Sequence, residues 1–397
     1  MDNDTPPPLP AVATSAADAR DLRRKLRQPA ILLVVSDLGQ GGTQTMVCRL
    51  ANAWSRSGRR VRLLVLLNRT DGMLNIDPAV EQVVLSSREL LWAPRPLQSL
   101  WRVMHWIAAM RREIVSSRPP LVLSFITSVN VQVLLACLGL PGLRVVVCER
   151  SDPARQRPGR HWTLLARLLY RTADLVTANS RGAVSTLAEF LPQQKLAYVP
   201  NLLPRRDDNV AVYTACSLIV ITGRLVPLKG HDLLFKAFAH ARNDLAGWRI
   251  AILGDGPDRE GLAELAKELG IAQLIDWHGH VADPYPYYRA AKICIVPSRY
   301  EGMPNALLEA MSCGLPAIVS DASPGLLELI SHERNGLIFT SDDSDALARA
   351  LLRLAKNGEL RSQLGAAAKE TAAAYDQDRA ILEWNRVIGL SIPGEPA

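Results

Sequence analysis

The chain has 397 residues, 48% of them hydrophobic and 21% charged, which is typical of a soluble protein with one large core or two ordinary ones. Its six cysteines occur singly and its seven histidines form no HExxH pattern, so we expect reduced thiols in a cytosol and no dedicated metal site. No nucleic-acid-binding motif accompanies the net charge of +7, so a membrane surface or an anionic substrate explains the basic clusters better than a nucleic acid does.

The chain opens with a Pro- and Ala-rich segment, residues 1–28, which is predicted to be a disordered tail and does not resemble a signal peptide. Apolar runs of strand length follow, separated by helical patterns, in ILLVVSD, VRLLVLL, EQVVLS, LVLSF, RVVVCE and DLVTAN. Residues 121–143 carry no formal charge and are long enough to span a bilayer. Their polar residues and the broken end GLPG favour instead a strand LVLSF, a polar loop and a buried helix VQVLLACLG.

The second half repeats the alternation, with apolar runs in SLIVITG, WRIAILG, LIDWHG, KICIVPS, PAIVSD and GLIFT. Such alternation predicts parallel sheets with helices on both faces. Twelve strands exceed one ordinary sheet, so we predict an α/β fold with two Rossmann-like, doubly wound domains. The break falls in the Pro- and charge-rich stretch VPNLLPRRDDNVAVYTAC, which divides a first domain over residues 29–205 from a second over 206–375.

In open α/β sheets, ligands bind beyond the carboxyl ends of the strands, and the first such loop is SDLGQGGTQTM. Gly39, Gly41 and Gly42 allow a ligand to approach the backbone closely. A dinucleotide fingerprint would need glycine where Gln44 stands, and no acidic residue cleanly ends the second strand, so an NAD site is disfavoured. A ligand loop and a tight turn into a helix both remain open.

Three loops of the second half carry further candidates. Arg224 and Lys229 flank a short loop before a helix that begins near Asp232, and two fixed cations beside a helix N-terminus suit a diphosphate. Gly254 lies in GDGP, where plain turn chemistry is the simpler interpretation. The backbone of His280 and Val281, in HGHV, could read the edge of a base.

The stretch EGMPNALLEAMSCGLP places Glu301 in a loop and Glu309 within the following helix, for which Asn305 is a natural N-cap. The free N–H groups of that helix start lie between the two carboxylates and attract phosphate. The spacing suits an extended ligand with hydroxyls at both ends. The alternative is that Glu309 merely solvates an exposed helix face.

Together, GRLVPLKG, GDGP, HGHV and EGMPNALLEAMSCGLPAIVSD resemble, in that order, the glycosyltransferase group 1 family, the retaining family 4 of the GT-B fold. The resemblance covers roughly residues 217–339. In the first half, GQGGTQTMVCRLANA, SFITSVN and VCERSDP are more loosely similar to a subgroup that builds bacterial cell-surface polysaccharides or lipid-linked oligosaccharides, including N-acetylgalactosaminyltransferases.

The resemblance implies roles for the charged residues. Glu301 would contact the donor sugar near the reacting carbon, Glu309 would bind the ribose hydroxyls, and Arg224 and Lys229 would neutralise the leaving nucleoside diphosphate. The N–H groups facing the diphosphate would be those of Gly302, Met303, Asn305, Ala306 and Leu307. Because side chains act as the cation, neither a metal nor another cofactor is expected. The resemblance also implies front-face attack with retained configuration, and a C-terminal helix within residues 376–397 that crosses back to the first domain.

The sequence departs from many relatives after the fifth strand of the first domain. They carry a histidine near the donor sugar, whereas VVVCERSDP places Glu149 and Arg150 there, so these two become candidates for catalysis. The alternative is a structural pair between Arg150 and Asp152.

The acceptor is expected to enter through the first domain, where ARQRPGRHWTLLARLLYR has a basic amphipathic pattern. It sets Arg155, Arg157, Arg160, Arg167 and Arg171 beside Trp162, Leu164, Leu165, Leu168 and Leu169. This pattern fits an anionic membrane surface, and it equally fits a core helix with a solvated basic face.

The sequence therefore predicts a retaining glycosyltransferase that moves a hexose or N-acetylhexosamine from a nucleotide sugar, expected to be UDP-linked, to a polyprenyl-diphosphate-linked glycan. It would work in the cytoplasm, peripherally on the inner face of the plasma membrane. A UDP-N-acetylglucosamine 2-epimerase-like enzyme and a catalytically inactive sugar-binding scaffold of the same fold are the alternatives.

Overall fold

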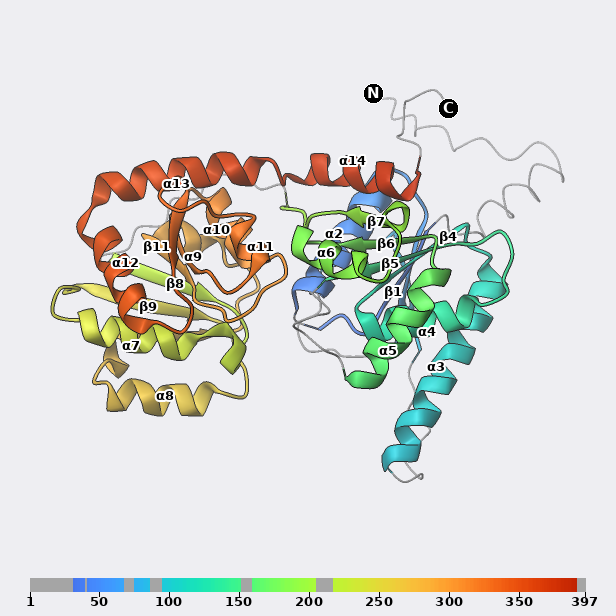
Figure 1. Ribbon diagram of the computed structural model, residues 1–397, viewed down its shortest axis with the longest axis horizontal. Helices are drawn as coiled ribbons and strands as arrows, with labels where there is room; N and C mark the ends of the chain where they lie inside the picture. The colour runs from blue at the N-terminus through green and yellow to red at the C-terminus, as the bar shows by residue number, and fades with distance from the viewer. Residues whose placement is uncertain are drawn as a thin grey trace, which may run out of the picture.

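The computed structural model describes residues 31–39, 41–67, 75–85, 95–150, 159–204 and 217–390, with the backbone alone for residues 95–100 and Arg160. The expected tail over residues 1–28, the domain boundary at 205/206, and Asp152, Arg155 and Arg157 lie outside the described residues. Two domains stand side by side, each with one sheet between layers of helices (Figure 1).

Seven parallel strands form the sheet of the first domain, in the order β3-β2-β1-β4-β5-β6-β7. They are β1 (Ile31–Val35), β2 (Val61–Val65), β3 (Glu81–Val84), β4 (Leu121–Phe125), β5 (Arg144–Glu149), β6 (Leu175–Ala178) and β7 (Leu196–Tyr198). The helices are α2 (Gly42–Arg56), α3 (Arg95–Ser117), α4 (Thr127–Cys137), α5 (Arg160–Leu169) and α6 (Arg181–Ala188), with short turns η1 (Tyr170–Thr172) and η2 (Gln193–Lys195).

The central strands of this sheet are covered on both faces, because successive residues of a strand point to opposite sides and both sets are apolar here. In β1, Ile31, Leu33 and Val35 pack with α2, whereas Leu32 and Val34 pack with α3, α4 and α5. A strand buried on both sides needs an unbroken apolar run, which is the pattern of ILLVV.

The second domain has six parallel strands in the order β10-β9-β8-β11-β12-β13. They are β8 (Ser217–Thr222), β9 (Trp248–Leu253), β10 (Ile275–Gly279), β11 (Ile293–Val296), β12 (Ala317–Ser320) and β13 (Gly336–Phe339). Around them lie η3 (Pro227–Lys229), α7 (His231–Ala241), α8 (Arg259–Glu268), η4 (Ala272–Leu274), α9 (Tyr285–Ala290), α10 (Asn305–Ser312), α11 (Pro324–Leu327), α12 (Ser344–Lys356) and α13 (Gly358–Ala373).

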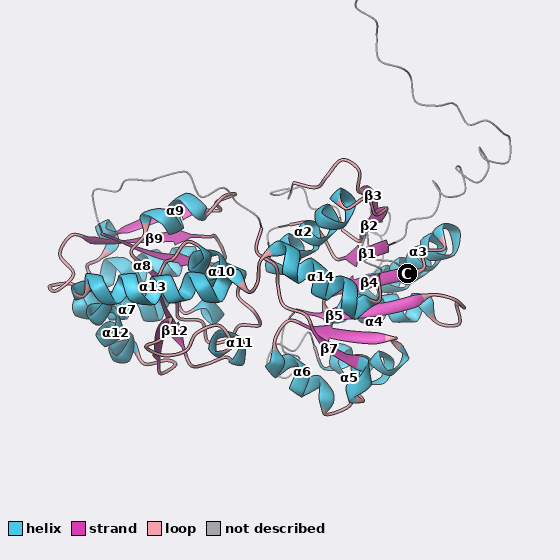
Figure 2. Cartoon of the chain, turned by 90° about the horizontal axis from the view of Figure 1, so that it is seen from above, coloured by secondary structure: helices cyan, strands magenta, loops and turns pink. Residues whose placement is uncertain are grey.

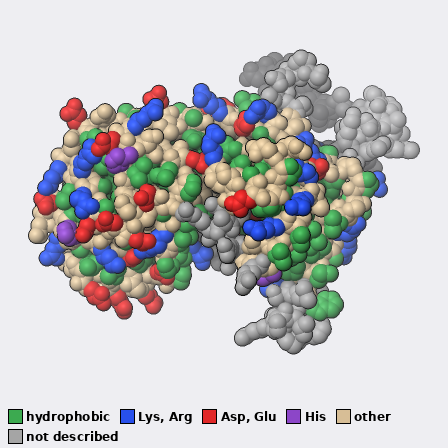
Figure 3. Space-filling model, in the orientation of Figure 1, with side chains coloured by type: hydrophobic (Ala, Val, Ile, Leu, Met, Phe, Trp, Pro, Cys, Tyr) green, Lys and Arg blue, Asp and Glu red, His purple; other side chains and the backbone are tan. Residues whose placement is uncertain are grey.

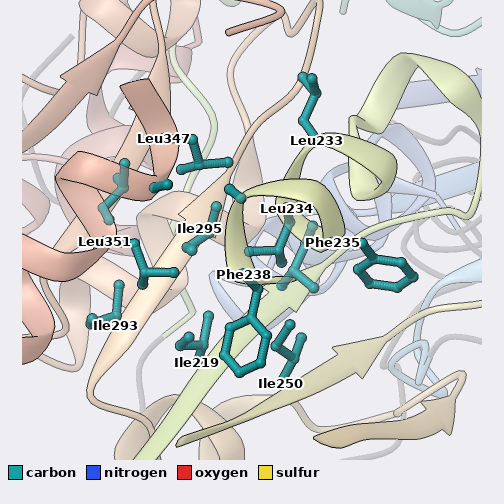
Figure 4. Packing of buried hydrophobic residues seen from close by; sticks show 14 of the residues in the cluster. Ile219, Leu233, Leu234, Phe235, Phe238, Ile250, Ile293, Ile295, Leu347 and Leu351 are labelled. Atoms are coloured by element: carbon teal, nitrogen blue, oxygen red, sulfur yellow. The ribbon is translucent and has the colours of Figure 1, made fainter. Parts of the chain in front are cut away.

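The core of the second domain on one sheet face is dominated by α7 and α12. Figure 4 shows Phe238 of α7 against Ile219 and Ile250 of the sheet, with Leu347 and Leu351 of α12 nearby. All five side chains have no solvent exposure. Burying a side chain of this size stabilises the folded chain by about 1.5–3 kcal/mol. This packed layer therefore fixes the strands of the second domain and the loops that follow them.

The last helix of the described residues, α14 (Gln377–Ile388), follows α13 and packs on the other domain. Figure 1 shows α13 and α14 along the top edge, one over each domain, and in Figure 2 α14 lies next to α2. Trp384 is fully buried against Trp54 of α2, with ring centroids 6.3 Å apart, and Trp54 Nε1 donates to Asn385 Oδ1 at 3.0 Å. The core of the first domain is therefore closed by a segment that follows the second domain in sequence.

The structure confirms the predicted α/β class with two doubly wound parallel-sheet domains. All twelve predicted strands are present, and a thirteenth, β7, was missed because the three residues of LAY form no apolar run. The polar loop expected between β4 and the buried helix was wrong: α4 begins at Thr127 and takes in the polar residues. Within the described residues, no helix is both long and apolar enough to cross a membrane.

Candidate active site

The strand orders locate the crevice in each domain. In each sheet the first three strands are added toward one edge, and the fourth strand then pairs with the first on its other side. The direction of the strand order therefore reverses between β1 and β4 and between β8 and β11. Ligands of doubly wound sheets bind at this point, beyond the carboxyl ends of the strands. The loops that follow β1, β8 and β11 are those that carry the predicted glycines, cations and carboxylate.

Lys229 and Glu301 meet at the crevice of the second domain. Lys229 ends the short turn after β8, Glu301 follows β11, and Lys229 Nζ forms an ion pair with Glu301 Oε1. Ser298 Oγ donates a second hydrogen bond to the same oxygen at 2.8 Å. The Lys229 side chain is 26% exposed and that of Glu301 12%, so both are available to a ligand but only partly hydrated.

The two loops are fixed to each other. Arg299 lies between β11 and Glu301, and its guanidinium donates to both carboxylate oxygens of Asp232, each at 3.0 Å. Its backbone N–H donates to the Leu228 carbonyl oxygen at 2.8 Å. After Lys229 the chain turns through Gly230 with φ of 70°, where a Cβ would lie 2.2 Å from the Pro297 carbonyl oxygen. Lys229 is thereby held in place beside Glu301.

The helix α10 begins at Asn305, and its start touches the first domain. Asn305 was expected to be the N-cap, but Pro304 occupies that position and its side chain makes no capping hydrogen bond. The Asn305 side chain instead donates to the Gly42 carbonyl oxygen at 3.1 Å and accepts from Asn201 Nδ2 at 2.8 Å. The N-termini of α2 and α10, one from each domain, therefore meet. Two helix starts with free N–H groups attract an anion such as a diphosphate.

Glu309 is buried rather than exposed, so the alternative of a solvated helix face was wrong. Its Oε1 accepts from Arg49 Nη2 at 2.6 Å, across the boundary between the domains. The Glu309 side chain is 9% exposed and that of Arg49 17%. The charge of the carboxylate is thus balanced by a guanidinium from the first domain.

Glu149 and Arg150 lie at the end of β5, but the Glu149 carboxylate is enclosed. It is 1% exposed and accepts from Thr127 Oγ1 at 3.0 Å and from the Tyr170 hydroxyl. Burial raises its pKa from 4.5 to about 7, although hydrogen bonds from Tyr170, Thr127 and Asn130 and the charge of Arg150 oppose the shift.

The Arg150 guanidinium lies 5.0 Å from the centre of the Trp384 ring and 5.6 Å from that of Phe125, and it donates to the Val199 carbonyl oxygen at 3.3 Å. Its contacts therefore join the first sheet to α14. The Arg150 carbonyl oxygen lies close to Gly302 of the second domain. A Cβ at Gly302 would be only 2.9 Å from that oxygen. Gly302 allows this close approach of the two domains.

The other predicted donor residues lie in loops after strands of the second domain, at the start of α10 and at the start of α2. Arg224 and His280 are exposed, Val281 is half-buried, and Gly254 donates its N–H to the Gly279 carbonyl oxygen at 2.7 Å. In α10 and the loop before it, Ala306 is half-buried, whereas Met303 and Leu307 are buried and can offer a ligand only their backbone. In the first domain, Gly41 precedes α2 in extended conformation and Gly42 is exposed.

Sequence reasoning missed the first-domain residues that hold α10. Asn201 donates to the Met303 carbonyl oxygen at 2.9 Å as well as to Asn305, and Arg49 binds Glu309. Each of these residues is more than 100 positions away in sequence from the residue that it binds. Arg49 lies on a helix with an ordinary amphipathic pattern and Asn201 in the segment assigned to a linker, so no local signal marked either one.

A second interdomain feature is a hollow of about 620 Å³ beside the start of α14, whose lining includes Arg181, Tyr198, Glu328 and Tyr375. None of the predicted donor residues lines it. On its wall, Glu328 accepts from the backbone N–H groups of Arg181 at 2.6 Å and Gly182 at 3.2 Å. The charged pair and the two helix starts lie elsewhere, at the strand ends.

Two Rossmann-like domains whose strand ends face each other, with a cation, a carboxylate and helix starts between them, define a protein of the GT-B class. Two adjoining family models match the chain: Glycosyltransferase Family 4 over residues 40–204 and Glycosyl transferases group 1 over residues 209–371. The chain belongs to the group 1 glycosyltransferases of the GT-B fold.

The chain is similar to two named relatives and to a solved structure. An exopolysaccharide phosphotransferase of Streptomyces coelicolor is 30% identical over 62% of this chain, which spans only 26% of that relative's length. A Campylobacter jejuni α-1,4-N-acetyl-D-galactosaminyltransferase, whose name gives a diphospho-undecaprenol-linked glycan as its substrate, is 24% identical over 90% of this chain and 98% of its own. The Anabaena protein HepE, solved with UDP and glucose, superposes with a TM-score of 0.73 at 16% identity, over 90% of this chain and 99% of its own.

Proposed function

We propose that this protein transfers a hexose or N-acetylhexosamine from a UDP-sugar to a lipid-linked glycan, with retention of the anomeric configuration, in the synthesis of a surface polysaccharide or lipopolysaccharide. The observation that carries the proposal is the meeting of the α2 and α10 N-termini beside the Lys229–Glu301 pair. Fixed positive groups from both domains there surround one place for a diphosphate.

The residues divide the donor between them. The diphosphate lies at the start of α10, where Arg224 and Lys229 stabilise the negative charge that grows as the nucleotide leaves. Glu309, one turn further along α10, accepts from the ribose hydroxyls. Glu301 lies next to Lys229 and before α10, so its carboxylate faces the sugar attached to the diphosphate. No metal or other cofactor takes part.

In the transfer, the bond between the anomeric carbon and the phosphate oxygen breaks, and the acceptor hydroxyl oxygen bonds to that carbon from the same face. The acceptor proton goes to the departing phosphate oxygen. The departing nucleotide carries more negative charge than the bound donor does at the reacting oxygen, so Lys229 and Arg224 bind the transition state more strongly than the ground state.

The substrate name of the Campylobacter relative supports a lipid-linked glycan as the acceptor, which approaches through the first domain. On α5, Leu164 and Leu168 are each 62% exposed, with exposed Arg167 between them. On α3, Trp101 is 60% exposed. Figure 3 shows apolar side chains gathering over α5 and α3 at the lower right, with basic ones around them. Apolar groups beside cations suit an anionic membrane surface, to which the protein binds peripherally on the cytoplasmic side.

The transfer is tested with radiolabelled UDP-hexoses and UDP-N-acetylhexosamines and an undecaprenyl-diphosphate-linked glycan. We expect label in the lipid-soluble product, with an α-linkage when the donor is an α-linked sugar. Epimer formed without an acceptor would indicate an epimerase, and no turnover of any nucleotide sugar would indicate a binding scaffold. Either result would overturn the proposal.

The membrane surface is tested separately by co-sedimentation with vesicles. The protein should bind vesicles that contain anionic phospholipid and dissociate as salt rises, because surface charges are screened within about 8 Å at physiological salt. Replacing Leu164 and Leu168 by serine should weaken binding, whereas Leu382→Ser, a change at a 46% exposed position on α14, should not. Equal binding to neutral vesicles, or no effect of the double change, would contradict the assignment.

A further inference from the structure

Arg49 links the first domain to the helix that carries Glu309. It lies on the second turn of α2, and its guanidinium makes two contacts outside that helix. Nη2 donates to Glu309 Oε1 at 2.6 Å, and Nη1 donates to the Leu202 carbonyl oxygen at 3.2 Å. Leu202 itself is buried in the first domain, where it packs with α2 and α14. The guanidinium is therefore anchored in the first domain while it binds a carboxylate of the second.

This ion pair belongs to a set of cross-domain contacts that hold one helix. Asn201 binds the Met303 carbonyl oxygen and Asn305, and Asn305 binds the Gly42 carbonyl oxygen. All of these fix the start of α10. Arg49 is the charged member of the set. It binds Glu309, the residue of α10 that we assign to the ribose of the donor.

We propose that Arg49 is a positioning residue for the ribose of the donor. It holds the Glu309 carboxylate through Oε1, while Oε2, which has no hydrogen-bond partner among the described residues, accepts from the ribose hydroxyls. The inference rests on the proposed function, because it gives Arg49 a role only if Glu309 binds ribose. Donor affinity then depends on the arrangement of the two domains, since Arg49 can hold Glu309 only when α2 and α10 are in contact.

The chemistry of a carboxylate permits this double use. An ionised carboxylate has two oxygens and about four sites for hydrogen-bond donors, so one arginine does not saturate it. A guanidinium bound to one oxygen fixes the carboxylate plane, and ribose hydroxyls then meet a carboxylate that needs no reorientation. The Glu309 side chain is only 9% exposed, so without Arg49 its carboxylate would lack a counter-charge and would turn toward water.

The test measures the coupling between Arg49 and the ribose hydroxyls by binding, without catalysis. Dissociation constants for UDP and 2′,3′-dideoxy-UDP are determined by calorimetry for the unchanged protein and for Arg49→Ala. A hydrogen bond to a charged group contributes enough for roughly a 10- to 100-fold change in affinity. We expect the unchanged protein to bind the dideoxy nucleotide more weakly than UDP by that factor. Arg49→Ala should bind UDP about tenfold more weakly and lose little more on the dideoxy nucleotide.

Two further variants separate positioning from general stability. Arg49→Lys keeps the charge but has a single ammonium group, so it should restore part of the preference for UDP. Arg56→Ala is the matched control: Arg56 is on the same helix, 69% exposed, with its Nε 3.7 Å from an Asp77 carboxylate oxygen. It should bind both nucleotides like the unchanged protein. Melting curves check that each variant is folded.

The outcomes distinguish this inference from the function on which it rests. If the unchanged protein binds UDP and prefers it to the dideoxy nucleotide, but Arg49→Ala and Arg49→Lys keep the whole preference, Arg49 has no positioning role and the proposed function stands. If the unchanged protein does not bind UDP, both the proposed donor and the role of Arg49 are wrong.

Discussion

Replacing Lys229 by alanine removes the cation that we expect to stabilise the leaving diphosphate. In the structure, the ammonium pairs with Glu301 and its side chain is 26% exposed, so the free energy of unfolding should fall by no more than about 1 kcal/mol. The effect on catalysis should be much larger, because the diphosphate that we expect Lys229 to contact gains charge only as the nucleotide departs. A lost contact of this kind is worth about 3–4 kcal/mol, or roughly a 100- to 1000-fold fall in kcat.

The assay is donor-dependent kinetics at saturating acceptor, with a melting curve for each variant. Lys236→Ala is the matched control, because Lys236 is on α7 in the same domain, 50% exposed, with an ion pair of 3.9 Å to Asp232. The control should keep kcat and lose little stability. If Lys229→Ala stays folded with near-normal kcat, the leaving-group role is wrong, and with it the electrostatic account of the transfer.

Three further predictions follow from the same geometry. Glu309→Gln should mainly raise the donor KM, since we expect Glu309 to bind ribose in ground and transition states alike; a comparable fall in kcat at saturating donor would contradict this. Activity should survive EDTA with little change, because we propose that side chains and helix starts supply the positive charge; a strict need for magnesium or manganese would refute this. The pKa of the buried Glu149 carboxyl is raised to about 7, so the folded protein resists an ionisation that the unfolded chain undergoes freely above about pH 4.5. The unchanged protein should therefore lose stability as pH rises from about 4.5 to 7, whereas Glu149→Gln should not. The difference in the free energy of unfolding between them should grow by up to about 3 kcal/mol. Urea unfolding of both proteins between pH 4 and 8 measures this difference, and a constant difference would mean that Glu149 is not buried as described.

The strands could be predicted because their signal is local. An apolar run such as ILLVV or ICIV fits a strand covered on both faces, and the parallel order follows from the alternation with helices. β7 could not be found in this way, since all three of its residues are only half-buried and edge strands need no continuous apolar run.

The charged centre of the site was accessible from sequence for the same reason. Lys229 and Glu301 each follow a recognisable strand, and strands that are neighbours in a doubly wound sheet bring their following loops together. The pairing of Arg49 with Glu309 was not accessible, because it joins residues 260 positions apart on different domains. Asn305 shows the opposite failure: its local preference for a helix cap was overridden by the cross-domain bonds to Asn201 and Gly42.

The enclosure of Glu149 also escaped sequence reasoning. Its carboxylate is surrounded by Thr127 and Asn130 of α4 and Tyr170 of η1, which come from segments before and after β5. No spacing along the chain reveals that three polar groups converge on one buried acid. The sequence could therefore place Glu149 correctly at the end of β5 without showing that its carboxylate is enclosed.

The position of α14 has a consequence for how the chain folds as it is made. The ribosome releases the strands of the first domain early, but Trp54 and its neighbours lack their cover until Trp384 and Ile388 have been synthesised. The second domain, whose strands and covering helices run without interruption from β8 to α13, can close its core sooner. We therefore expect the domain that is made first to be finished last, and a chain cut short before α14 to present an open apolar face to chaperones and proteases.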